Sequence, residues 1–165
     1  MRDPHSLLLT KYQQLPGRLE AAIAGLDEAG LDWKGSGWSI RQYVHHVVEG
    51  ELIWEVNLRA AAGLDGITFP MGWYFTQPQE VWAERWAYDR RPVGPALALF
   101  HASTCDLVAF LHAVSTEIWK HSGRITWVDS NQESSLTVLD ILRMHIRHMD
   151  GHTADIRAIR EEHGA

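Results

Sequence analysis

The feature that most constrains the fold is an apolar stripe along the last part of the chain. Its members recur at intervals of three or seven residues, which are one or two helical turns, and are Leu136, Leu139, Leu142, Met149, Ile156 and Ile159. This period places them on one face of an α-helix, so it predicts a long amphipathic helix that begins near residues 134–135. Such a helix must bury its stripe against other elements.

Three earlier segments show the same period, at about residues 5–26, 39–62 and 92–119. Residues 125–128 are expected to be briefly extended, but no series of strands is long enough to predict a sheet. The sequence therefore predicts an all-α fold, a four-helix bundle that forms one domain over residues 1–165.

Helix-breaking residues separate the predicted helices. Pro16 and Gly17 make a weak point in the first helix, where we expect a kink. Residues 30–37 end that helix, and Ser39 is a candidate N-cap or first-turn residue of the second helix. Residues 63–91, which include an amphipathic stretch, are too long for a tight hairpin. We expect this long connection between the second and third helices to cross the bundle or to shape a site.

The net charge and the cysteine content exclude several classes of protein. The net charge is −6 and the pI is about 5.9, whereas a nucleic-acid-binding face would be basic. The longest early apolar run, residues 7–9, is too short for a signal peptide or a membrane span. Cys105 is the only cysteine, which rules out an intrachain disulfide, and its spacing predicts a small core residue. We therefore expect a cytoplasmic protein with no nucleic-acid or membrane partner.

Histidines cluster on the predicted last helix. His148 and His152 are four residues apart, so they lie one turn apart on the same face and can hold one metal ion. His145 and His148 make a second usable pair. His145 and His152 are two turns apart, about 10 Å along the axis, and cannot readily share an ion. All three project toward the apolar arc, so spacing alone leaves both pairs open.

A third ligand is expected from the second helix, which carries His45 and His46. Helical projection places His46 on a flank of the apolar arc beside Gly50, which would leave room for a substrate above the imidazole. His45 projects nearer the opposite pole, with Arg41 and Glu49. His46 is therefore the more inward of the pair. Three neutral nitrogen ligands would leave coordination positions open, as catalytic metal sites require.

Other interpretations of these residues stay open at this point. A histidine on an apolar face is commonly a satisfied core residue, and buried imidazoles could satisfy one another without a metal. A shared metal would satisfy them together. Trp73, Trp82 and Trp86 fall in the long connection, where they could line a pocket, make a subunit contact or form a small core under the loop.

Two motifs resemble those of one protein family. Residues 38–46 (WSIRQYVHH) and a late His-x-x-x-His followed by residues 153–156 (TADI) are similar to the DinB/YfiT-like superfamily, which comprises proposed metal-dependent hydrolases and thiol-dependent transferases. The resemblance implies a homodimer and one divalent metal ion, zinc or nickel, with the ligands His46, His148 and His152. Relatives often carry an acid at the position of Glu49, and His145 is an extra histidine beside the ligands. These two are the candidate catalytic residues.

The leading hypothesis is an enzyme in which the metal activates a small nucleophile toward a small-molecule substrate. The ion could lower the pKa of water toward neutrality for hydrolysis. It could also bind a low-molecular-weight thiol as the thiolate, an option that the resemblance implies. The alternatives are a non-catalytic, metal-binding dimeric bundle with a stress or interaction role, and a bundle that holds no metal.

Overall fold

The chain forms a helical structure with a small sheet. The computed structural model describes residues 4–127 and 132–164. Within them the α-helices are α1 (Pro4–Gln13), α2 (Leu15–Ile23), α3 (Glu28–Leu31), α4 (Ile40–Gly63), α5 (Gln79–Arg85), α6 (Val93–Ala113) and α7 (Val138–Glu162). The 3-10 helices are η1 (Tyr74–Thr76) and η2 (Thr116–Lys120), and the strands are β1 (Ile67–Thr68), β2 (Ser122–Trp127) and β3 (Gln132–Thr137).

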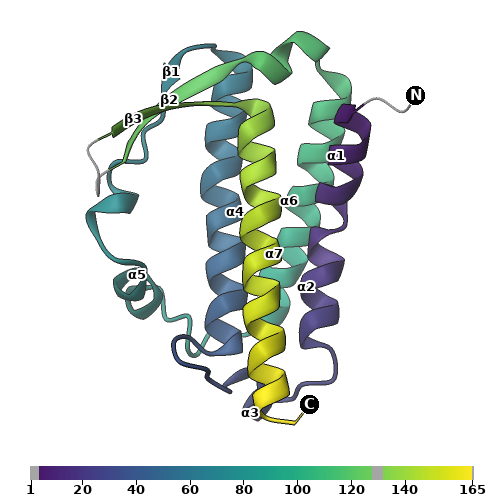
Figure 1. Cartoon of the computed structure of the whole chain (residues 1–165), viewed down its shortest axis with the longest axis vertical. Helices are drawn as coiled ribbons and strands as arrows, with labels where there is room; N and C mark the ends of the chain where they lie inside the picture. Colours follow the sequence, from purple (N-terminus) through teal and green to yellow (C-terminus); the bar gives the residue numbers. More distant parts are fainter. Residues whose placement is uncertain (1–3, 128–131, 165) are drawn as a thin grey trace.

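Four long helical segments pack side by side, which confirms the predicted four-helix bundle (Figure 1). Helix α4 packs against α6 and α7, and the segment formed by α1 and α2 packs against the same two helices. Helices α4 and α6 run in the same direction, so the connection between them must return along the length of the bundle. The predicted long crossover is therefore present. The apolar stripes of these helices meet in one cluster of buried side chains.

Reciprocal capping boxes set where α4 and α7 begin. The Oγ of Ser39 accepts a hydrogen bond from the backbone N–H of Gln42, and the Oε1 of Gln42 accepts one from the backbone N–H of Ser39. Thr137 and Asp140 make the same exchange at the start of α7. The predicted start of the last helix at residues 134–135 is therefore wrong, because those residues belong to β3.

Two other helix boundaries differ from the prediction. The first predicted helix is interrupted at Gln14, two residues before the expected kink at Pro16 and Gly17, and so forms two helices, α1 and α2. Pro16 occupies the first turn of α2, where a missing N–H is tolerated. The third predicted helix ends at Ala113 rather than near residue 119. There Ser115 starts η2 by accepting a hydrogen bond from the backbone N–H of Glu117 at 3.4 Å.

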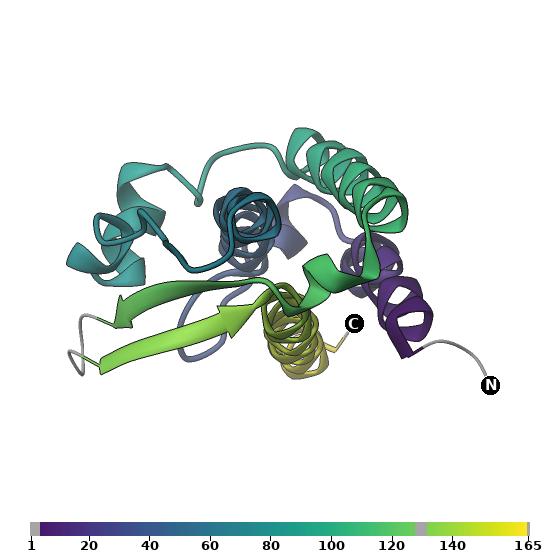
Figure 2. The ribbon, with the colours of Figure 1, turned by 90° about the horizontal axis from the view of Figure 1, so that it is seen from above.

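A small three-stranded sheet lies beside one end of α4 and α7, which the sequence did not predict (Figures 1 and 2). Strand β2 pairs in parallel with β1 and antiparallel with β3, in the order β1-β2-β3. Residues 125–127 are extended as expected, and Val128 lies outside the described residues. The Nε1 of Trp127 donates to the Oγ of Ser134 at 3.0 Å across the hairpin. Because β3 is polar and β1 is short, their partners rather than any local period define them as strands.

Gly123 in β2 allows the close approach of a buried ring. A Cβ at this position would lie 2.0 Å from the Cε1 and 2.1 Å from the Cζ of Phe69, which is 4% exposed. Gly123→Ala is therefore expected to lower the free energy of unfolding by about 1–3 kcal/mol, as measured with urea. Gly151→Ala, where a Cβ meets nothing within 4 Å in mid-α7, is the control and should raise it by about 0.5–1 kcal/mol. An unchanged stability for Gly123→Ala would contradict the expected clash.

Aromatic side chains fold the long connection onto the bundle. The rings of Trp82 and Trp86 stack with their centroids 4.9 Å apart, and Tyr74 stacks on both. Trp73 meets Trp82 edge-on and stays 50% exposed. Tyr74, Trp82 and Trp86 form a small core under the loop, one of the three alternatives, and Trp73 lies at its exposed edge. Figure 2 shows the connection and the β2–β3 hairpin on the same side of the bundle, beyond α4 and α7.

Helix α6 is the one helix among the described residues that is long and apolar enough to cross a membrane, with a mean hydropathy of 1.4. This is weak evidence for a membrane span, because a core helix of a soluble protein passes the same test.

Phe100, Leu107 and Leu111 lie on the buried face of α6. Cys105 is exposed, so the prediction that it is a core residue is wrong. It lies one position beyond Thr104, which belongs to the buried face.

Candidate metal centre

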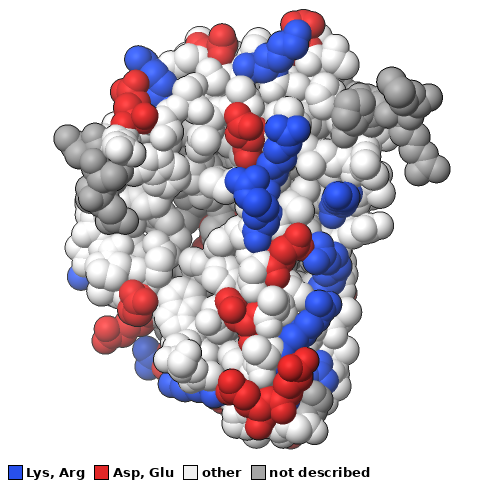
Figure 3. Space-filling view, in the orientation of Figure 1, with Lys and Arg blue, Asp and Glu red and all other residues white. Residues whose placement is uncertain are grey.

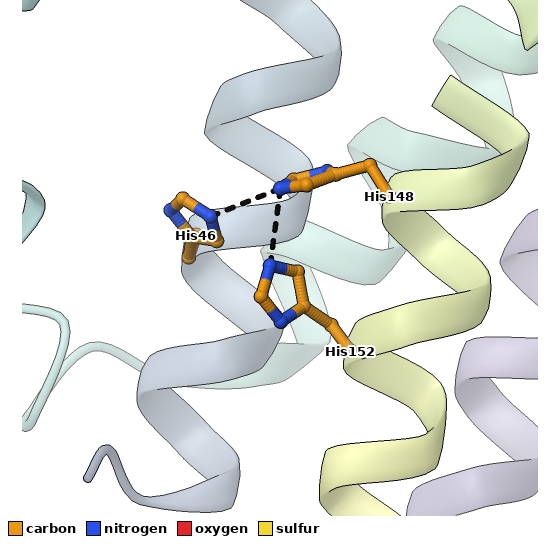
Figure 4. Close-up of side chains that lie close together, drawn as sticks. All are labelled: His46, His148 and His152. Atoms are coloured by element: carbon orange, nitrogen blue, oxygen red, sulfur yellow. Dashed lines mark hydrogen bonds between the residues drawn. The ribbon is translucent and has the colours of Figure 1, made fainter. Parts of the chain in front are cut away.

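Three histidines from α4 and α7 point toward one another (Figure 4). The Nε2 of His148 lies 3.1 Å from the Nε2 of His46 and 3.1 Å from the Nε2 of His152. One nitrogen from each residue lies within 4.8 Å of the other two. His148 and His152 are neighbours on one face of α7, and the packing of α4 against α7 brings in His46. We call these three residues the three-histidine cluster.

The geometry and charge of this cluster fit one divalent ion. Two nitrogens that bind the same zinc at about 2.0–2.1 Å and at a tetrahedral angle lie ~3.3 Å apart. The two nitrogen–nitrogen distances of 3.1 Å come close to this value. Burial, and then the charges of the neighbouring histidines, lower the pKa of His46 to about 3 and that of His148 to about 4. Both imidazoles are therefore neutral near pH 7 and can offer a lone pair to a cation.

These lowered pKa values predict how the stability of the metal-free protein depends on pH. In the unfolded chain His46 and His148 titrate near 6.5, so between pH 6.5 and about 4 the unfolded state binds protons that the folded state does not. The free energy of unfolding should be highest above pH ~6.5 and should fall below it, by up to about 1.4 kcal/mol per pH unit for each histidine.

Urea unfolding of the metal-free protein at several pH values between about 5 and 8 measures this dependence. The variant His46→Gln/His148→Gln should show a shallower slope. Some slope should remain, because burial also lowers the pKa of His45. A variant with the same slope as the wild type would contradict the assignment.

Neighbouring side chains hold the rings of the cluster in place. The Nδ1 of His152 lies 3.0 Å from the Oδ2 of Asp155, the carboxylate–histidine contact that is common for metal ligands. Trp38 packs edge-on against His46 with ring centroids 4.7 Å apart, and Tyr43 lies 5.2 Å from His152 by the same measure. The Nδ1 of His46 is buried and has no hydrogen-bond partner in the part of the chain that the structure describes.

His45 lies inside the protein, contrary to the helical projection. It is 1% exposed, and its Nε2 lies 3.0 Å from the carbonyl oxygen of Arg91. Arg41, which was expected on the same polar face, is 4% exposed and donates to the same carbonyl oxygen at 3.3 Å. The end of the long connection covers this face of α4. A projection of one helix cannot reveal such a cover, because the covering residues are far away in sequence.

Glu49 contacts the long connection rather than the histidines. Its Oε1 accepts a hydrogen bond from the Nη1 of Arg91 at 2.8 Å. Arg41, His45 and Glu49 follow one another at intervals of one turn along α4, and all three bind Arg91. This row of contacts fastens the end of the connection to the bundle.

His145 is paired with a buried acid that the sequence analysis missed. Its Nδ1 lies 2.6 Å from the Oε2 of Glu51, and the residues are 6% and 3% exposed. The Nε2 of His145 and the Oε1 of Glu51 have no partner among the described residues. Glu51 follows Val44 by seven positions and Val47 by four, so it falls within the apolar arc of α4. An acid in that arc was the signal that could have revealed the pair.

A cavity of about 260 Å³ opens beside the three-histidine cluster, between α4, α7 and the long connection. Its lining residues are His46, Gly50, Trp54, Tyr74, Gln79, Met144, His145 and His148. Two residues of the cluster and one of the candidate catalytic residues therefore face the same space. Figure 3 shows a recess on this face of the molecule, beside a row of charged side chains that follows α7.

A family model agrees with the motifs and the fold. The model of the DinB superfamily matches residues 11–156. The chain belongs to the DinB superfamily.

This DinB-superfamily protein is 25% identical over 155 residues to a protein of Bacillus cereus strain AH820, a match that covers 93% of this chain and 83% of that one. It is 26% identical over 159 residues to a protein of Bacillus mycoides strain KBAB4, with the same coverage. The names of both relatives propose a metal-dependent hydrolase.

Two solved structures share the fold of this DinB-superfamily protein. YfiT from Bacillus subtilis, described as a probable metal-dependent hydrolase with an unusual four-helix bundle topology, matches with a TM-score of 0.82 and 17% identity over 99% of this chain and 91% of that one. A mycothiol-dependent maleylpyruvate isomerase matches with a TM-score of 0.68 and 17% identity. That match covers 93% of this chain and 61% of the isomerase.

Proposed function

We propose that this DinB-superfamily protein is a divalent-metal-dependent enzyme that hydrolyses a small molecule. The observation that carries the proposal is that His46 and His148 face each other within the cluster and also line a cavity. A structural metal site is closed by its protein ligands, whereas a catalytic site keeps a position open to substrate. The names of the two Bacillus relatives support hydrolysis as the reaction class.

His46, His148 and His152 would hold the ion, with zinc and nickel as the candidates. The bound ion would supply Lewis acidity, which lowers the pKa of water toward neutrality and polarises a substrate oxygen. The protein's own contribution is to keep two of the imidazoles neutral by burial and to orient His152 through Asp155. The cavity beside them would exclude bulk water from the bound substrate.

We assign separate roles to the two candidate catalytic residues. His145 lines the cavity, and its contact with Glu51 orients the ring through Nδ1. Its Nε2 is buried and has no partner among the described residues, and we infer that this nitrogen would exchange a proton with a substrate that reaches it. Glu49 does not line the cavity, and we infer a positioning role for it. Its ion pair with Arg91 holds the end of the connection that carries the cavity residues Tyr74 and Gln79.

A second candidate is a thiol-dependent reaction, in which a low-molecular-weight thiol takes the place of water. The fold shared with a mycothiol-dependent isomerase favours this candidate. The same ligands and the same cavity would serve it, so the two candidates differ in the nucleophile. A non-catalytic metal-binding bundle is the third. The homodimer and the cytoplasmic location stay predictions from the sequence.

Turnover by the zinc-loaded or nickel-loaded protein tests the proposal. Small p-nitrophenyl esters are offered without a thiol, and electrophiles such as 1-chloro-2,4-dinitrobenzene are offered with and without a small thiol. The proposal expects ester hydrolysis that EDTA removes and that needs no thiol. Turnover only with thiol would support the second candidate, and stoichiometric metal without turnover would support the third. The absence of stoichiometric metal would overturn all three.

A further inference from the structure

The cavity beside the three-histidine cluster has uncharged walls. Trp54, Tyr74 and Met144 are its large side chains, and no Lys, Arg, Asp or Glu is among the described residues that line it. The nearby acids are already paired, Glu51 with His145 and Glu49 with Arg91. In Figure 3 a row of charged side chains follows α7 and others lie at the edges of the molecule, whereas the surface immediately around the recess is largely white. In the part of the cavity away from the three-histidine cluster, an anion would lose its water without gaining a cationic side chain.

One wall of the cavity presents a free hydrogen-bond donor. The hydroxyl of Tyr74 donates to the Oε1 of Gln79 at 2.7 Å, and burial raises the pKa of Tyr74 to about 12, so this hydroxyl keeps its proton near pH 7. With Oε1 engaged, the amide N–H groups of Gln79 have no protein partner within the described ranges. The Nε1 of Trp82 donates to the carbonyl oxygen of Tyr74 at 2.8 Å, which fastens this wall to α5.

Gly50 leaves space directly above a histidine of the cluster. A Cβ at this position would have one neighbour within 4 Å, the Cε1 of His148 at 3.6 Å. A larger side chain would therefore extend into the cavity over the imidazole. The volume of about 260 Å³ lies below the ~300–1,000 Å³ that drug-sized ligands occupy, which limits the occupant to a small molecule.

We propose that the cavity takes a small, uncharged carbonyl compound, an ester or an amide. Its apolar group would lie against Trp54, Tyr74 and Met144, and a carbonyl oxygen would accept a hydrogen bond from the amide of Gln79. This inference rests on the proposed function, for which it names the substrate class.

Binding of benzamide and benzoate, a neutral and an anionic probe of the same shape, tests the proposal. The dissociation constants are measured by NMR titration with the metal-free protein, because a carboxylate would bind an ion directly. Benzamide is expected to bind at least about tenfold more tightly than benzoate. Gly50→Leu should weaken benzamide binding by more than about tenfold by filling the cavity, and Gln79→Leu by about three- to tenfold by removing one hydrogen bond.

Gly151→Leu is the matched control, because Gly151 is also a mid-helix glycine but a Cβ there meets nothing within 4 Å and its side is exposed. It should bind benzamide as the wild type does. Benzoate binding as tight as benzamide binding, unchanged affinity in Gly50→Leu, or no benzamide binding would each overturn the proposal. The comparison needs neither metal nor turnover, so its failure is distinct from failure of the proposed function.

Discussion

His148→Ala is expected to abolish stoichiometric metal binding. His148 is the one residue whose Nε2 contacts both other members of the cluster, so its loss leaves two nitrogens on different helices. We expect the affinity for zinc to fall by more than the ~10–100-fold that follows loss of an outer-shell partner. Isothermal titration gives the affinity, and elemental analysis of the purified protein gives the stoichiometry.

Two variants make this result interpretable. Asp155→Asn removes the carboxylate beside the Nδ1 of His152 and should cost about 10–100-fold in zinc affinity, an intermediate effect. His101→Ala removes a half-exposed histidine of α6 that pairs with Glu20, and it should bind zinc as the wild type does. If His148→Ala bound as much zinc as His101→Ala, the three-histidine cluster would not be the metal site.

The second large effect is expected for the buried pair of Glu51 and His145. Removing one member leaves the other buried without its partner, so Glu51→Met and His145→Leu should each lower the free energy of unfolding by about 3–5 kcal/mol. The double variant replaces both members with apolar side chains and should lose much less than the sum of the two. Urea unfolding of the metal-free protein gives all four values of this cycle.

The exposed pair of Lys120 and Glu117 is the control for this cycle. Its side chains are 75% and 72% exposed, and its Nζ–Oε2 distance is 3.0 Å. The coupling energy of this pair should lie below about 1 kcal/mol, because solvent screens exposed charges. Additive effects of the Glu51 and His145 substitutions would show that the buried contact does not stabilise the fold as a pair.

Local sequence signals predicted much of the bundle. Ser39 marked the start of α4, and four members of the predicted apolar stripe, Leu142, Met149, Ile156 and Ile159, lie on the buried face of α7. The strands were missed because β3 has a polar sequence whose pairing partner, β2, is defined only by the folded hairpin. The start of the last helix was predicted too early for the same reason. Residues 134–135 are compatible with a helix, but they pair with β2 as part of β3.

The residues of the site can likewise be separated into those that local sequence predicted and those that tertiary contacts placed. Helical spacing placed His148 and His152 on one face of the last helix, and projection made His46 more inward than His45, because these relations depend on one helix at a time. The family resemblance then selected the pair His148 and His152 over the pair His145 and His148. The burial of His45, the pairing of Glu51 with His145 and the cavity walls from Tyr74 and Gln79 were decided by tertiary structure. They depend on the long connection returning along α4, and contacts between residues far apart in sequence leave no period that the sequence alone could show.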